Sequence, residues 1–198
     1  MVEVTILELF GARKKTYKKG AAVYNEGSPA NFYFQVISGE VKMTNYNDDG
    51  KEFIQGIFSA GDSFGEPPLL NGKLYLTNAV ALTDSEMYVL PKPDFLRMLH
   101  ANPDTAIAIC IRLADRLYYK SIMAAEISSQ EPEHRLLKLF DFLKYDVAGM
   151  KKGDKYNVTL TRQQLADLTG LRVETVIRSI KALEKKGDVV IDNRKVFR

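Results

Sequence analysis

Residues 173–185 carry side chains suited to recognising the edges of nucleic-acid bases. Apolar residues recur there at spacings of three and four, which predicts an amphipathic helix. The apolar positions are Val173, Val176, Ile180 and Leu183, and the positions on the opposite face are Glu174, Arg178, Lys181 and Lys185. Arg178 offers a planar fork of donors for O6 and N7 of guanine, and Glu174, one turn earlier, can accept from the N4 amine of cytosine. Together they are suited to reading a G·C pair in the major groove.

The preceding segment, residues 160–170, predicts the first helix of a helix-turn-helix. Thr161 can cap this helix, and Gln164, three residues on, can close a capping box. Ala166 is small enough for a second helix to cross closely. Gly170 supplies the left-handed residue that ends the helix and makes the sharp turn. Two short helices joined in this way form the helix-turn-helix of DNA-binding proteins.

Other basic residues of this region are placed for the phosphate backbone. Arg162 and Gln163 begin the first helix, and Lys181 and Lys185 lie farther along the second. Residues 188–198 predict a β-hairpin wing turning at 192–194. The alternative is that the helical pair is only core architecture with a solvated basic face.

The distribution of charge agrees with a polyanionic partner. The net charge is +3, but residues 1–127 hold 13 Lys/Arg against 15 Asp/Glu, while residues 128–198 hold 15 against 10. The basic final third is typical of proteins that meet nucleic acid. Lysine-rich surfaces also serve solubility, so composition alone does not decide between the two.

Composition excludes several other classes of protein. The 198 residues are 45% hydrophobic and 27% charged, as in globular proteins. The single cysteine, Cys110, excludes a disulfide framework and a cysteine-rich metal site. His100 and His134 are too few for a histidine metal cluster, so we expect no metal and no cofactor. Residues 1–10 do not form a signal peptide and no apolar run could span a bilayer, so we expect a cytoplasmic protein with no membrane partner.

The elements that carry these residues fall into an α+β arrangement. From about residue 17 to 91, turn-forming pairs recur between short runs such as 32–37 and 79–82, which are rich in aromatic and β-branched residues. This pattern predicts an all-β sandwich or barrel. Residues 105–127 then predict a long helix of about 23 residues, some 35 Å.

The long helix carries an apolar stripe wide enough for two partners. Its central positions are Cys110, Leu113, Leu117 and Ala124, and Ile107, Ile111 and Ala114 widen it. We expect the helix to pack on its own β-domain and on the same helix of a second subunit. The alternative is a helix buried entirely within its own chain.

A polar segment ending in Pro132 separates the long helix from the basic third and predicts a hinge. The next helix is expected over residues 133–147. The expected domains are a β-roll at 1–103, a dimerisation helix at 104–127, a hinge at 128–132 and a winged helix-turn-helix at 133–198.

Over roughly residues 15–198 the chain resembles the CRP/FNR family of bacterial transcription regulators. The likeness rests on residues 19–27, 34–42 and 61–66, and most specifically on Thr161-Arg162-Gln163 followed by residues 170–178. The resemblance implies an N-terminal β-roll of the cyclic-nucleotide-binding, jelly-roll type, a long dimerisation helix and a C-terminal winged helix-turn-helix. It also implies a homodimer, a near-palindromic double-stranded DNA operator, and RNA polymerase as a partner.

The resemblance further implies that Glu174 and Arg178 read bases and that Arg162 touches the DNA backbone. Thr175 belongs to the matched motif and joins the candidate DNA contacts. Arg172 stands where the family commonly has a Ser or Thr that caps the recognition helix. Capping is therefore expected to be weaker here, and Arg172 becomes available for a phosphate or a base.

In the region where this family binds its effector, the present sequence differs from the family motif. Ten residues after the glutamate of Gly65-Glu66, cyclic-nucleotide binders have an arginine for the cyclic phosphate, and here Leu76 follows instead. A buried phosphate without that arginine loses a bidentate, charge-assisted pair. The candidate effector pocket comprises Phe64, Gly65, Glu66, Leu76, Thr77, Asn78, Lys120 and Ser121. Lys73 or Lys120 is the candidate replacement for the arginine.

Two interpretations of the Gly65-Glu66 pair stay open. Glu66 accepts from a ligand hydroxyl, or the pair is a tight turn beside a surface carboxylate. Because the arginine is missing, we expect that cyclic AMP and cyclic GMP are not the effectors. The site around Leu76 would suit a smaller, less charged ligand or be filled by side chains. The chain has no N-terminal cysteines for the iron–sulfur sensing of FNR. The only histidine near the β-domain, His100, follows its last strand, so we expect no histidine-ligated haem there.

The sequence thus predicts a dimeric, sequence-specific DNA-binding transcription regulator and not an enzyme. A β-barrel enzyme of the cupin type would need a cluster of histidines. The remaining alternative is a sensory or scaffolding module whose winged helix binds protein, against which the basic face and the pair of Glu174 and Arg178 argue. The sequence does not distinguish an activator from a repressor.

Overall fold

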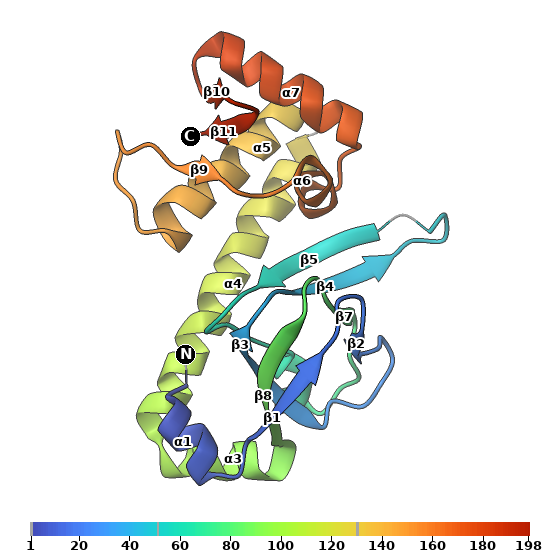
Figure 1. Ribbon diagram of the computed structural model, residues 1–198, viewed down its shortest axis with the longest axis vertical. Helices are drawn as coiled ribbons and strands as arrows, with labels where there is room; N and C mark the ends of the chain where they lie inside the picture. The colour runs from blue at the N-terminus through green and yellow to red at the C-terminus, as the bar shows by residue number, and fades with distance from the viewer. Residues whose placement is uncertain (1, 51, 130) are drawn as a thin grey trace. The chain divides into compact units, whose positions relative to one another are not determined.

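The computed structural model describes residues 2–50, 52–129 and 131–198, without the side chains of Met123 and residues 126–129. The chain forms two compact units, residues 1–113 and 114–198, and each is described by itself. Figure 1 labels their elements. The first unit holds α1 (Val4–Leu9), β1 (Arg13–Tyr17), β2 (Ala22–Tyr24), β3 (Phe32–Ser38), β4 (Val41–Tyr46), β5 (Glu52–Phe58), β6 (Ser63–Phe64), α2 (Glu66–Asn71), β7 (Asn78–Ala81), β8 (Ser85–Pro91), α3 (Lys92–Ala101) and the start of α4 (Pro103–Ser129). The second holds the rest of α4, then α5 (Pro132–Asp141), η1 (Phe142–Val147), β9 (Asn157–Val158), α6 (Arg162–Thr169), α7 (Val173–Lys186), β10 (Val190–Asp192) and β11 (Lys195–Phe197).

The first unit is a β-roll of two antiparallel four-stranded sheets, as the sequence predicts. Their strand orders are β1-β8-β3-β6 and β2-β7-β4-β5. Between β3 and β4 the chain reverses at Gly39, whose φ is +82° and where an added Cβ would lie 2.6 Å from the carbonyl oxygen of Asp84. Only glycine fits such a left-handed and crowded position.

Aromatic side chains fill much of the space between the two sheets. Phe34 stacks on Phe64 with ring centroids 5.4 Å apart, and Tyr24 stacks on Tyr75 at 3.6 Å. Tyr33 stacks on Phe95 of α3 at 4.7 Å and is fully buried. These large rings bury the apolar area that stabilises the roll.

Helix α4 begins two residues before the expected start and ends two residues after the expected end. Ile109 is 5% exposed and packs in the core of the first unit. Leu113, expected in the seam for a partner helix, is partly buried against that same core, and its place in the seam stays a prediction. The alternative, a helix buried entirely within its own chain, does not hold for the chain by itself, since Ile107 and Ile111 are exposed.

The second unit is a small helical domain with a three-stranded sheet. The helix expected over 133–147 is α5 followed by η1, which is π-helical. The expected hairpin is β10 and β11, and β9 joins β11 as a third strand that the sequence did not predict. The core gathers apolar side chains from α5, β9, α6, α7 and β11: Leu136, Leu139, Phe140, Val158, Leu165, Val176, Ile180, Leu183 and Val196.

The expected hinge includes Gln130, which lies outside the described residues, so the hinge and the expected domain boundaries remain predictions. No helix in the described part of the chain is both long and apolar enough to cross a bilayer. Among those residues no group of three His, Cys, Asp or Glu side chains is arranged to bind a metal ion.

Candidate nucleic-acid interface

Helix α6 is fixed at both ends by the residues that the sequence singles out. The Thr161 hydroxyl accepts from the backbone N–H of Gln164 at 3.1 Å, and the Gln164 side chain accepts from the N–H of Thr161 at 2.8 Å. Gly170 ends the helix with a φ of +69°. Beyond the turn, Leu171 donates its N–H to the Ala166 carbonyl. Together these bonds set where α7 begins.

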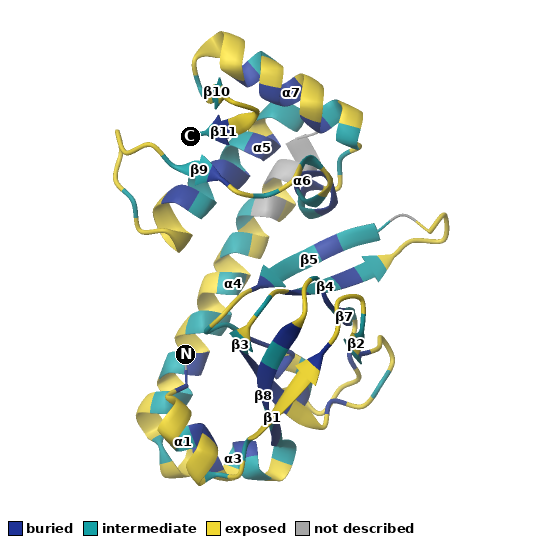
Figure 2. Ribbon diagram, viewed as in Figure 1, coloured by how far each residue is buried: buried dark blue, intermediate teal, exposed yellow. Residues whose placement is uncertain are grey.

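Helix α7 has one buried face and one exposed face, as Figure 2 shows. Val176, Ile180 and Leu183 are buried in the core of the second unit. The exposed face carries Glu174, Ile177, Arg178, Lys181 and Lys185. Burial of the apolar face therefore holds the charged side chains toward solvent.

The cations of this face are free for a partner. Within the described part of the chain, neither Arg172, Arg178, Lys181 nor Lys185 enters an ion pair. By contrast, Lys186 pairs with Glu133 of α5 at 2.6 Å, and Arg198 pairs with Asp141 at 2.6 Å. Lys186 and Arg198 thus connect different elements of the second unit. The unpaired cations remain available to bind an anion.

The other candidate DNA contacts differ in their accessibility. Arg162 is half-buried, and burial lowers the pKa of its guanidinium. Gln163 is exposed, but its amide donates to Asp167 at 2.8 Å. Thr175 is half-buried, and Arg172 precedes α7 without a side-chain cap, as expected.

Sequence reasoning missed two features of this surface. Ile177 is 40% exposed between the charged residues of α7, and its spacing from Glu174 and Arg178 would have placed it on their face. A groove of about 540 Å³ lies between the wing and the segment entering α6, lined by residues 157–162 and 194–196. No local sequence pattern indicates this groove, because its two walls are brought together by the pairing of β9 with β11.

The candidate effector residues are only partly brought together. Gly65 has a φ of +81°, and an added Cβ would lie 3.3 Å from Tyr75 and 3.4 Å from Tyr24. Glu66 is 1% exposed, so its interpretation as a surface carboxylate is wrong. Phe64 is fully buried in the aromatic core.

The residues after α2 differ in their exposure. Leu76 is 77% exposed, and its assignment to an effector pocket stays a prediction. Thr77 is half-buried, and the side-chain oxygen of Asn78 accepts from the N–H of Glu26 at 3.0 Å. Lys73 is exposed.

Lys120 and Ser121, expected to complete that pocket, belong to the second unit. Both are exposed, and the Ser121 hydroxyl donates to the carbonyl of Leu117, one turn earlier, at 2.9 Å. Their assignment to an effector pocket stays a prediction.

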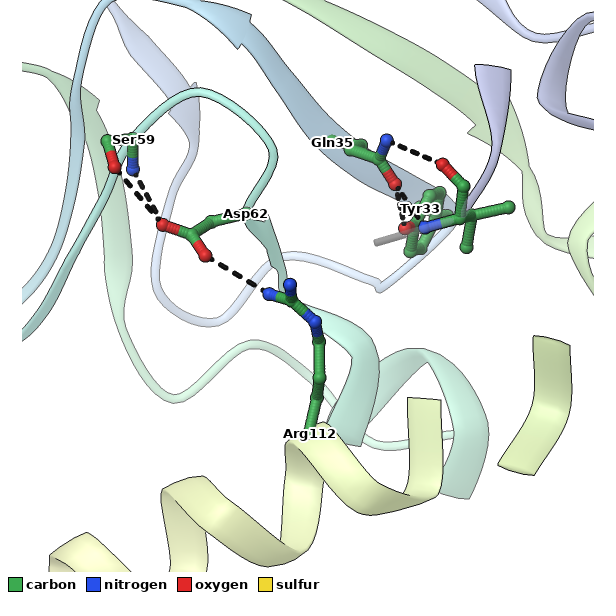
Figure 3. A network of polar contacts seen from close by, with 6 residues as sticks. Tyr33, Gln35, Ser59, Asp62 and Arg112 are labelled. Carbon is green, nitrogen blue, oxygen red and sulfur yellow. Dashed lines mark hydrogen bonds and ion pairs between the residues drawn. The ribbon is translucent and has the colours of Figure 1, made fainter. Parts of the chain in front are cut away.

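A charged contact ties the β-roll to α4 within the first unit, as Figure 3 shows. Arg112 of α4 donates to one carboxylate oxygen of Asp62 at 3.1 Å. The other oxygen accepts from the N–H of Ser59 at 3.0 Å and from its hydroxyl at 3.3 Å. Asp62 lies directly before β6, so α4 is joined to the turn that leads into Gly65-Glu66.

A second network in Figure 3 holds the N-terminal segment. The side chain of Gln35 accepts from the N–H of Val2 at 3.1 Å and donates to its carbonyl at 2.9 Å. The hydroxyl of Tyr33 donates to the same side chain at 2.8 Å. These buried bonds anchor the segment before α1 to β3.

Comparison with known families agrees with this architecture. Residues 14–102 match the cyclic nucleotide-binding domain, and residues 134–197 match the Crp-like helix-turn-helix domain. The cAMP-activated global transcriptional regulator CRP of Pasteurella multocida is 27% identical over 169 residues, which cover 85% of this chain and 81% of that protein. Such relatives are transcription regulators, a family without enzymatic activity.

Two solved structures share the fold at low sequence identity. The c-di-GMP responsive global regulator CLP of Xanthomonas campestris has a TM-score of 0.75 and 22% identity, covering 98% of both chains. A CooA mutant of Carboxydothermus hydrogenoformans has a TM-score of 0.79 and 20% identity, covering 100% of this chain and 86% of the other.

The buried phenol of Tyr75 gives a measurable signature of the aromatic core. Burial, with the nearby Glu66 carboxylate, raises the pKa of Tyr75 to about 12. Because this native pKa lies above the ordinary value, stability is full below about pH 10 and falls as the pH rises toward 12. The Tyr75→Phe variant should lose one late-ionising phenol in an ultraviolet titration and lose less stability over this range. Tyr145→Phe, at an exposed position, is the control, and an unchanged late ionisation in Tyr75→Phe would contradict the assignment.

Proposed function

The chain belongs to the CRP/FNR family of DNA-binding transcription regulators, and we propose that it acts as a homodimer on near-palindromic duplex DNA, independently of cyclic AMP. The observation that carries the proposal is the exposed charged face of α7, held outward by burial of Val176, Ile180 and Leu183. As in its family, RNA polymerase is the expected partner at a promoter.

In the proposed complex α7 enters the major groove and reads base edges. Arg178 donates to O6 and N7 of guanine, and Glu174 accepts from cytosine. Ile177, exposed between them, suits the methyl group of thymine. Arg162, Lys181 and Lys185 neutralise phosphates and fix the register of the protein on the duplex.

The exposed side of α4 supports the proposed dimer. Ile107, Ile111 and Tyr118 are 57%, 56% and 63% exposed, and with Ala114 they follow the alternating spacings of four and three that form a coiled-coil seam. Ile109, on another side of the same helix, is buried in the β-roll core. The helix therefore covers its own sheet with one side and offers another apolar side to a second copy.

The β-roll argues against cyclic AMP as the effector. Leu76 occupies the place of the phosphate-binding arginine, and the stacked rings of Tyr24 and Tyr75 lie directly against Gly65. The relative from Pasteurella multocida is named as a cAMP-activated regulator. Leu76 supplies no charge to pair with a buried cyclic phosphate, which needs such a partner.

We further propose that the roll influences DNA binding through α4 by a population shift. A ligand or partner acts only if it binds one arrangement of the DNA-binding domain better than another. The pair of Arg112 and Asp62 is the direct link between α4 and the turn before Gly65-Glu66.

The first test of the proposed function separates base reading from phosphate binding. Arg178→Ala should cost about 1 to 3 kcal/mol per half-site and relax the base preference, because a bidentate base contact is lost. Lys185→Ala should weaken binding to all sequences alike, since it removes only a phosphate contact. Binding of variant duplexes at several salt concentrations measures both effects. Loss of affinity in both variants without any change in preference would show that the assigned face is wrong.

The second test addresses the dimer. Light scattering at micromolar concentration should give twice the chain mass of 22.3 kDa. Ile111→Asp should give monomers and lose affinity for palindromic DNA, because it places a charge in an apolar seam. Leu9→Asp makes the same type of change at an exposed leucine of α1 and should remain dimeric. A monomeric wild-type chain would contradict the proposal.

The third test concerns the effector. Loss of a buried charge pair typically costs about 3 to 5 kcal/mol, a factor of hundreds or more in affinity. Calorimetry should therefore find roughly millimolar or weaker binding of cyclic AMP to the wild-type chain. Leu76→Arg should bind more tightly, and Leu74→Arg, at another exposed leucine of the same segment, should not. Low-micromolar binding by the wild type with tighter DNA binding would show that a lysine has replaced the arginine.

A further inference from the structure

Two neighbouring tyrosines in the second half of α4 have different surroundings. Tyr118 is 63% exposed and belongs to the apolar seam of the proposed dimer. Tyr119, about 100° farther around the helix, packs against the core of the second unit. Among the α4 side chains that the structure describes, Tyr119 is the one that joins this core. Within the second unit, one turn of α4 thus offers one side to a second copy and another side to the DNA-binding domain.

Tyr119 contacts the DNA-binding domain through an aromatic stack. Its ring lies on the ring of Phe142, the first residue of η1, with centroids 4.1 Å apart and planes inclined by 28°. Burial raises the pKa of Tyr119 to about 12, as expected for a phenol removed from water. The π-helical turn that begins at Phe142 is a rare conformation and is frequently found at functional sites.

Phe142 is connected to α7 through α5. It follows α5 directly in the chain, and apolar side chains of α5 and α7 share the core of the second unit. Lys186, at the end of α7, also pairs with Glu133, at the start of α5, at 2.6 Å. A continuous set of contacts therefore leads from the seam residue Tyr118, through the adjacent Tyr119 and the stack, to the helix that reads DNA.

We propose that the stack of Tyr119 on Phe142 sets the spacing between the two half-sites that the dimer accepts, which makes Tyr119 a positioning residue for DNA recognition. The inference rests on the proposed function, which it extends from base reading to the distance between half-sites. Inserting one base pair moves a half-site by about 3.4 Å along the duplex and turns it by about 35°. A dimer whose two α7 helices are held firmly rejects such a change, whereas one whose DNA-binding domains move freely accepts it.

The test is selection from random duplexes of about 40 base pairs, long enough for two half-sites, performed in parallel with the wild-type chain and its variants. The wild type should enrich paired half-sites at one spacing. Tyr119→Ala should enrich the same half-site sequence, because its α7 face is intact, but at several spacings. A stacked ring pair changes an equilibrium constant by roughly two- to tenfold, so enrichment of the preferred spacing over its one-base-pair neighbours should fall by about that factor.

Further variants test whether the stack itself is responsible. Phe142→Ala removes the other ring and should broaden the spacing as Tyr119→Ala does, and the double variant should broaden it no further, because both changes break one contact. Tyr119→Phe keeps a ring at this position and should keep the single spacing. Tyr145→Ala removes an exposed ring of η1 outside the stack and should match the wild type. All these variants should be dimeric by light scattering.

The outcomes separate the inference from the proposed function. If the wild-type chain enriches no paired half-sites, the proposed function fails. If it enriches them and Tyr119→Ala keeps the single spacing, or if the wild type itself accepts several spacings, the inference is overturned while the function stands. A monomeric Tyr119→Ala, or loss of half-site enrichment in both Tyr119→Ala and Phe142→Ala, also overturns the inference, because the rings then support the seam or the fold of the domain.

Discussion

Helix α7 can bury only one of its two faces, and the C-terminal unit is built around the face that it buries. Val176, Ile180 and Leu183 pack with α5, α6 and the small sheet, which fixes the rotation of the helix about its axis. The capping box at Thr161 and the left-handed Gly170 fix where α7 starts. Because these constraints act together, the charged face is held outward, and among the described residues its cations form no ion pair. Preorganisation of this kind lowers the cost of ordering side chains on binding.

Helix α4 also buries only one of its sides within the chain, but its exposed side is apolar rather than charged. One side is covered by the β-roll through Ile109 and Leu113, and the pair of Arg112 and Asp62 adds a polar link. Another side leaves Ile107, Ile111 and Tyr118 exposed. A second copy would cover that side and place two α7 helices in one assembly. The symmetry of such a dimer then requires the same symmetry in its DNA site.

Sequence reasoning was most reliable where local chemistry decides the structure. The capping box, the turn at Gly170 and the two faces of α7 follow from neighbouring residues alone. Features that depend on contacts between distant segments were missed: the two-residue strand β9, the inward direction of Leu113 and the burial of Glu66. Helix α2 was missed because six residues beginning Glu-Pro-Pro show no helical period. The groove at Arg194 was missed because one wall lies on the wing and the other before α6.

Selection of binding sites from random duplex DNA tests the central claim most directly, that two outward α7 helices read one operator. The account predicts enrichment of a two-fold symmetric sequence whose half-site centres lie about one helical turn, roughly 34 Å, apart. Each half-site should contain a G·C pair whose enrichment is lost when the selection is repeated with Arg178→Ala. Enrichment of a single asymmetric site, or no enrichment above the starting pool, would contradict the account.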